Sequence, residues 1–198
     1  NATVGKSAAV DSTADGSYTL VGNAACAMPP VPATAVSRKI HDAAGQFDVD
    51  LPLTGNPGIE CRSGGTNGDH QVVVTFPAAV TFDHASVTSG SGSVSSTSTN
   101  GSVVTVNLTG VGNAQTITIT LFGAQMGTNF GDVHIPMGVL LGDTNGDRFV
   151  DSADISQTKA ESGAAVTDAN FREDINADGF LDSADISAVK SKSGTALP

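Results

Sequence analysis

With 198 residues, the chain is long enough for one medium-sized domain or two small ones with a buried core. Its formal net charge of −11 argues against nucleic acid as a partner and favours cations. No segment reaches the ~18–20 apolar residues of a membrane span. The start at Asn1 instead of Met is what we expect of a processed chain whose targeting signal, if it had one, is already gone.

The N-terminal arm, residues 1–33, carries few large apolar side chains and is unlike a core segment. We expect a short strand at 17–22 (SYTLVG) to hold this arm, either in its own chain or as a strand donated to a neighbour. In an oxidising compartment Cys26 and Cys61 would close a loop of 36 residues, worth roughly 3–4 kcal/mol. The alternative is two unpaired thiols in the core.

Residues 34–141 read as a β-sandwich of the cohesin-like or immunoglobulin-like kind, because short β-branched runs alternate with Gly, Asn and Pro clusters. The run TITITL has period two, which predicts that Ile117, Ile119 and Leu121 face a core while the threonines face outward. The tract 86–102 has few large side chains and predicts an exposed hairpin or a flexible loop. The expected strands are 46–53, 71–76, 102–108, 116–122 and 132–141.

An internal repeat begins after Gly142, where the composition becomes acidic. Residues 143–163 and 174–194 share thirteen identities in twenty-one aligned positions, and no flexible linker separates them from the preceding strand. We therefore divide the chain into an arm, a sandwich and a repeat module at 142–198, with the last two in fixed relation. The expected fold class is mainly β with a small α module.

Each repeat contains a twelve-residue segment with oxygen ligands at positions 1, 3, 5, 7, 9 and 12, the pattern of a Ca²⁺ loop. Four carboxylates this close together would repel one another without a cation, so we expect two Ca²⁺ ions. In the first loop the ligands are Asp143, Asn145, Asp147, the Phe149 carbonyl, Asp151 through water, and Asp154. In the second they are Asp174, Asn176, Asp178, the Phe180 carbonyl, Asp182 and Asp185.

A short helix is expected after each loop, because an apolar stripe follows the last ligand. Ser152 and Ser183 are candidates to cap the first turns, and Gly163 and Gly194 to end the helices. The carboxylate at loop position 12 then lies in the first turn, where the helix dipole favours a negative charge.

These two D-x-N-x-D-x-x-[VL]-D-x-x-D loops, each followed by one helix and joined by AAVTDANFRE, resemble a type I dockerin. Two features set this family apart from an ordinary EF-hand, namely Asp at position 12 and no helix before the first loop. The resemblance covers about 142–198 and implies a Ca²⁺-folded, three-helix module that binds a cohesin. It also implies that loop positions 10 and 11 select the partner, which places Ser152 with Ala153 and Ser183 with Ala184 on two similar faces.

Arg148 departs from this pattern, because loop position 6 normally needs a glycine for a sharp turn with positive φ. A side chain in that conformation costs ~1–2 kcal/mol. We therefore expect the first loop to bind Ca²⁺ more weakly than the second, unless Arg148 gains contacts with another surface, including that of a partner.

No catalytic constellation is evident, so we expect a protein that is not an enzyme. Outside the repeat there are one glutamate, Glu60, and eight scattered aspartates. The histidines, His41, His70, His84 and His134, lack metal-ligand spacing and are expected at the surface or hydrogen-bonded in strands. The chain has no Trp and only Tyr18 as a tyrosine, which argues against the aromatic platform of a sugar-binding surface.

Three functions remain. The favoured hypothesis is a secreted or cell-surface structural protein whose copies associate through module, sandwich and arm into a Ca²⁺-dependent extracellular filament. The alternative is a monomeric adaptor whose module binds a separate cohesin-bearing protein. A carbohydrate-binding accessory is the weakest of the three.

Overall fold

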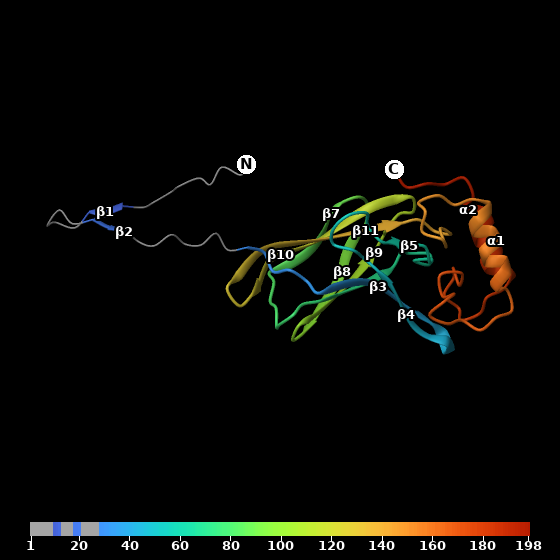
Figure 1. Ribbon diagram of the computed structural model, residues 1–198, viewed down its shortest axis with the longest axis horizontal. Coiled ribbons are helices and arrows are strands. Elements are labelled where there is room, and N and C mark those ends of the chain that lie inside the picture. Colours follow the sequence, from blue (N-terminus) through green and yellow to red (C-terminus); the bar gives the residue numbers. More distant parts are fainter. Residues whose placement is uncertain (1–9, 13–17, 21–27) are drawn as a thin grey trace.

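The structure, a computed structural model, describes residues 10–12, 18–20 and 28–198 (Figure 1). In the arm, strands β1 (Val10–Ser12) and β2 (Tyr18–Leu20) pair antiparallel. The strand expected at 17–22 is thus present at its centre, and its partner is another strand of the arm. Cys26, one half of the expected disulfide, lies outside the described residues.

Two sheets form the β-sandwich (Figure 1). Their strands pair antiparallel, apart from the parallel pair β5–β11. The five-stranded sheet has the order β4 (Gly45–Asp50), β3 (Thr34–His41), β6 (His70–Thr75), β9 (Val103–Thr109), β8 (Ser93–Asn100). The four-stranded sheet has the order β5 (Ile59–Glu60), β11 (Asn129–Val139), β10 (Gln115–Met126), β7 (His84–Ser89). The expectation of a mainly β chain is confirmed.

The core between the sheets follows the alternation seen in the sequence. Ile117, Ile119 and Leu121 are completely buried, as predicted. Thr120 was expected to face outward and is buried as well, because its hydroxyl is hydrogen-bonded to Thr88 and His134. A polar side chain can occupy a buried strand position when its hydrogen bonds are made.

The low-complexity tract 86–102 is neither a hairpin nor a flexible loop, and this expectation was wrong. It supplies most of β7 and β8, which lie at the edges of different sheets and pair with β10 and β9. Serine and threonine suffice there, because an edge strand is held by backbone hydrogen bonds and needs few large side chains.

The repeat region forms two helices, α1 (Ser152–Glu161) and α2 (Ser183–Lys192), which lie side by side at one end of the sandwich (Figure 1). The connector 164–173 contains turns, bends and the bridge residue Ala165 but no helix, so the expected third helix is absent from the described residues. The segment after each helix pairs with the other loop through the bridges Phe149–Ala196 and Ala165–Phe180. The two repeats are therefore paired reciprocally, each with the segment behind the other's helix.

The sandwich and the repeat module share a packed interface. Ile59 and Leu140 of the sandwich join Val150, Ile175 and Val189 in one apolar cluster. Backbone hydrogen bonds cross the interface from Gly142 N to Cys61 O (3.0 Å) and from Ser63 N to Ile175 O (2.7 Å). The two parts therefore sit in fixed relation, as the missing linker predicts.

A buried ion pair lies next to this interface. Arg62 is 1% exposed and donates from Nε and Nη2 to the two carboxylate oxygens of Glu60, at 2.8 and 2.7 Å. Burial alone would raise the pKa of Glu60, but the hydrogen bonds and charge of Arg62 outweigh burial and lower the pKa to about 2. Glu60 is thus a structural carboxylate, ionised at neutral pH.

None of the described helices combines the length and the apolar character that crossing a membrane requires.

Replacing Arg62 with methionine should lower the free energy of unfolding by about 3–5 kcal/mol, because it leaves the Glu60 charge buried without a partner. The matched control is Arg38→Met, since Arg38 pairs with Asp48 at 2.7 Å where both side chains are about 30% exposed. That change should cost less than about 1 kcal/mol. Urea denaturation followed by circular dichroism measures both, and equal losses would contradict the structural role of the buried pair.

Candidate functional site

The first loop is folded around the carboxylate at its start. Asp143 Oδ1 accepts hydrogen bonds from the backbone N–H groups of Gly146 (2.7 Å) and Asp147 (3.1 Å). Its other oxygen, Oδ2, accepts from Arg148 N at 3.0 Å. The side chain is fully buried, so the loop backbone converges on its first predicted ligand.

The carboxylate at position 12 closes the same loop from the helix side. Asp154 Oδ1 accepts from the N–H groups of Thr144 (2.9 Å) and Asn145 (3.2 Å), and Oδ2 accepts from Asp151 N (2.9 Å). Asp154 is also fully buried. One side chain in the first turn of α1 therefore holds both ends of the loop together.

The second loop repeats this arrangement. Asp174 accepts from Asp178 N (3.1 Å) and Gly179 N (2.9 Å), and Asp185 accepts from Ile175 N (2.9 Å) and Asp182 N (3.0 Å). Both carboxylates are fully buried. The sequence repeat is thus a repeat of geometry as well.

The helix caps differ from the sequence prediction by one position. Asp151 caps α1 and accepts from Ala153 N, and Asp182 caps α2 and accepts from Ala184 N, both at 2.6 Å. The expected caps, the serines that follow, are the first helical residues. The aspartate at loop position 9 is the N-cap residue because its carboxylate reaches a free backbone N–H of the first turn. Position 12 completes a capping box in each helix.

Buried carboxylates without a basic partner favour a cation in these loops. Within the described residues, neither Asp143 nor Asp185 forms an ion pair, and burial raises the pKa of both. An ionised carboxylate in such a place is costly unless a positive charge compensates it. Oxygen ligands alternating along a short turn suit Ca²⁺. The buried residues of both loops therefore fit this ion.

The remaining predicted side-chain ligands are exposed, apart from the half-buried Asp178, and their hydrogen bonds are local. Asp147 accepts from Phe149 N (2.9 Å) and from the Asn145 amide (3.0 Å). Asp178 does the same with Phe180 N (3.0 Å) and Asn176 (2.7 Å). In the part of the chain that the structure describes, no three His, Cys, Asp or Glu side chains gather into a finished metal cluster. The carboxylates at positions 5 and 9 would therefore have to turn inward to bind an ion.

Arg148 has the backbone conformation that the loop pattern demands. Its φ is +80°, close to the +83° of Gly179 in the second loop, so the expected positive φ is confirmed. The guanidinium Nη2 donates to Pro198 O at 2.7 Å, which is a contact within the chain that offsets part of the strain.

Gly179 shows why the second loop cannot carry an arginine at position 6. A Cβ on Gly179 would lie 2.7 Å from the carbonyl oxygen of His41, at the end of β3. The equivalent side of the first loop has room for the Arg148 side chain. The second loop thus touches the sandwich at the position where the first loop carries an arginine.

The predicted partner-binding positions are accessible in both repeats. Ser152 and Ala153 begin α1, Ser183 and Ala184 begin α2, and all four are exposed. Packing of the module on the sandwich therefore leaves two similar helix starts open.

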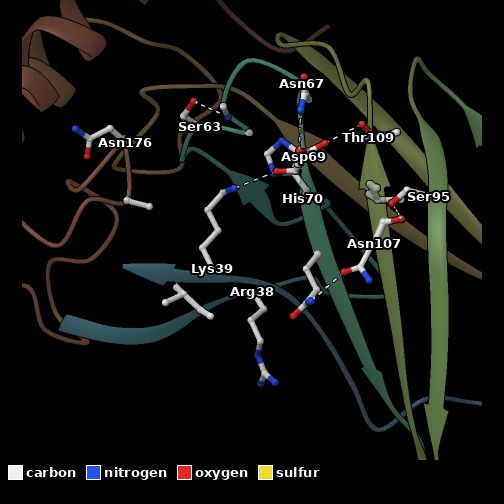
Figure 2. A pocket seen from close by; sticks show the side chains of 16 residues that line it. Arg38, Lys39, Ser63, Asn67, Asp69, His70, Ser95, Asn107, Thr109 and Asn176 are labelled. Atoms are coloured by element: carbon white, nitrogen blue, oxygen red, sulfur yellow. Dashed lines mark hydrogen bonds between the residues drawn. The ribbon is translucent and has the colours of Figure 1, made fainter. Parts of the chain in front are cut away.

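A polar groove of about 750 Å³ lies where the five-stranded sheet meets the second loop. In Figure 2, Lys39, Asp69 and His70 lie together on one wall, and Lys39 Nζ donates to Asp69 O at 3.2 Å. His70 was expected at the surface or hydrogen-bonded, but it is buried and its Nδ1 has no hydrogen-bond partner. Burial, aided by the charge of Lys39, lowers the pKa of His70 to about 4, so it is neutral at pH 7.

Cys61 is fully buried, and its Sγ lies 3.5 Å from the carbonyl oxygen of Arg172. Burial raises the pKa of this thiol to about 12. Arg172 also donates to backbone carbonyls of the first loop, from Nη2 to Asp143 O (2.8 Å) and from Nε to Thr144 O (2.7 Å). Cys61 is thus a residue of the interface between sandwich and loops.

Gly179→Ala should destabilise the protein more than Gly163→Ala. Both glycines have positive φ, +83° and +88°, but a Cβ at Gly163 would meet no atom within 4 Å. The control, Gly163→Ala, should lower the free energy of unfolding by about 1–2 kcal/mol because of backbone strain. Gly179→Ala should lower it by more, because the added Cβ also forces the second loop away from the sandwich. Thermal unfolding of the two variants gives the difference. Equal losses would mean that the close approach to His41 contributes nothing.

Arg148→Gly should raise the affinity of the first loop for Ca²⁺ by relieving the strain at φ +80°. Arg148→Ala is the matched control, because it removes the contact with Pro198 and keeps the strain. In a calorimetric Ca²⁺ titration, the first site of Arg148→Gly should therefore have a higher affinity than the first site of Arg148→Ala. Equal affinity of these two variants would show that strain at position 6 does not weaken the loop.

Comparison with known families agrees with this geometry. Residues 141–192 match the family model of the dockerin type I domain. No curated protein and no solved structure matches the chain. Domains of this type generally bind calcium and interact with a protein partner, typically a cohesin. The chain therefore carries a type I dockerin module behind an antiparallel β-sandwich.

Proposed function

We propose that this chain is a non-catalytic, calcium-dependent docking protein that works outside the cell or at its surface. The observation that carries the proposal is the pair of equivalent loop–helix units whose helix starts are both exposed. A partner that recognises Ser152 and Ala153 would find the same pair at Ser183 and Ala184. Each calcium ion, held by the six predicted ligand positions of its own loop, would fix the first turn of the helix behind it.

The partner we propose is a β-sandwich of a second copy. Contact between the dockerin module of one chain and the sandwich of the next is head to tail, and such contacts build filaments when they do not close into a ring. The fixed joint between the two parts supports this, because a regular filament needs the same geometry in every subunit. Strand β8 is an edge strand and exposed along most of its length, which leaves backbone groups free for pairing.

The alternative partner is a cohesin on a separate protein, which the family of the module favours. In that case the chain is an adaptor and stays monomeric by itself. The same helix starts would make the contact in both cases, so the identity of the partner is decided by experiment.

Two features, the burial of Glu60 and the lining of the polar groove, support a role without catalysis. Glu60, the one glutamate outside the repeat, is bound to Arg62 in the interior. The groove beside the second loop is lined without Phe, Tyr or Trp, so it lacks the stacking platform that sugar-binding surfaces commonly use. Neither observation favours an enzyme or a carbohydrate-binding accessory.

The test compares assembly of the purified chain in Ca²⁺ and in chelator, by light scattering and negative-stain microscopy. We expect fibres in Ca²⁺ and loss of fibres on chelation. Ala153→Arg or Ala184→Arg alone should leave one helix start intact and retain assembly, whereas the double variant should abolish it. Ala160→Arg, on an exposed position of α1 away from its start, is the control.

If the chain stays a monodisperse monomer at high concentration in Ca²⁺, the proposal of self-assembly is contradicted. Binding of that monomer to an immobilised cohesin domain, lost in the double variant, would establish the adaptor. Failure of the double variant to affect either contact would contradict the helix starts as the docking faces.

A further inference from the structure

A continuous chain of hydrogen bonds runs from the interior of the sandwich to the second calcium loop. Glu60 accepts two hydrogen bonds from the guanidinium of Arg62, and Arg62 Nη1 lies 3.0 Å from His41 Nε2. On the other side of the imidazole, His41 Nδ1 lies 2.7 Å from Asp174 Oδ2. All four side chains are fully or almost fully buried. His41 thus joins the sandwich to the first predicted ligand of the loop.

The direction of each hydrogen bond follows from the chemistry of Arg62. A guanidinium has donors only, so His41 Nε2 must accept. The neutral imidazole then carries its proton on Nδ1 and donates it to Asp174 Oδ2. Among the residues that the structure describes, Asp174 Oδ1 accepts a hydrogen bond only from Asp178 N, which leaves lone pairs of this carboxylate available to a cation.

In the described part of the chain, no side chain of the sandwich donates a hydrogen bond to the first ligand of the first loop. The carboxylate of Asp143 accepts hydrogen bonds from backbone N–H groups of its own loop. Gly179 adds a second difference, because the tip of the second loop lies against the His41 carbonyl. Within the described residues, a histidine of the sandwich therefore orients the first ligand of one loop and not of the other.

We propose that His41 is a positioning residue of the second calcium loop, so that calcium binding there and docking of the dockerin module onto the sandwich are coupled. The inference rests on the proposed calcium binding. A hydrogen bond from outside the ligand shell fixes the orientation of a metal-binding carboxylate, and its loss commonly lowers metal affinity 10–100-fold. By linkage, calcium in the second loop stabilises the interface by the same factor.

The experiment measures calcium binding to the second loop alone, in an Asp143→Asn background that disables the first. His41→Phe keeps a ring between Phe47 and Phe171, whose rings contact His41 edge-on, but removes the donor. We expect affinity to fall 10–100-fold, with partial rescue by His41→Gln, which restores an N–H donor. His134→Gln, on β11 and hydrogen-bonded to Thr120, is the control and should change nothing.

A second measurement does not depend on the His41 variants folding. In the Asp143→Asn protein with His41 intact, Ca²⁺ should slow amide hydrogen exchange at residues 39–41 and 61–63, which lie on the sandwich side. Unchanged exchange, or equal affinity with and without the His41 donor, overturns the coupling while calcium binding stands. Absence of calcium binding in the wild-type chain would instead overturn the proposed function itself.

Discussion

A buried guanidinium has to find an acceptor for each of its five N–H groups, and the packing of this protein around Arg62 is organised by that demand. Nε and one Nη2 hydrogen go to Glu60, and the other Nη2 hydrogen goes to Ser37 O. The Nη1 hydrogens go to Phe47 O and His41 Nε2. Every donor is therefore used, and the side chain of His41 is left with one proton that can point only at the module beyond the sandwich.

Aromatic packing reinforces the same junction. Phe47 of the sandwich and Phe171 of the connector stack with ring centres 5.4 Å apart, and the guanidinium of Arg62 lies 5.2 Å from the Phe171 ring centre. An arginine over an aromatic face gains electrostatic stabilisation while remaining buried. The connector, which does not form the helix that the resemblance implies, is thus held by contacts with the sandwich.

The parts of this molecule that could be predicted from sequence are those encoded locally. The twelve-residue loops carry their ligand pattern in consecutive positions, and the alternation around Ile119 marks a buried face within a single strand. Strand β3 was missed because Arg38 and Lys39 interrupt its apolar pattern, although its pairing with β4 and β6 places it inside a sheet. Its buried positions include Ser37, whose hydroxyl is satisfied by Glu60.

The site was predictable only as far as the loops themselves. His41 and Asp174 are 133 residues apart in sequence, and no spacing rule connects a histidine at a strand end with a carboxylate in a distant repeat. The same holds for Gly179, which the loop pattern explains through its backbone conformation alone. Its second reason, the His41 carbonyl at the position of a Cβ, exists only once the two parts are packed together.

The reciprocal pairing of the two repeats has a consequence for how the module unfolds. Val150 of the first loop exchanges backbone hydrogen bonds with Gly194 and Thr195 behind α2, and Leu181 of the second loop accepts one from Gly163 behind α1. Neither half keeps its short β-bridge when the other opens, so the halves should lose their structure in one cooperative step. A loop that releases a bound cation would loosen the opposite helix as well, and the two proposed docking faces would be lost together rather than one by one.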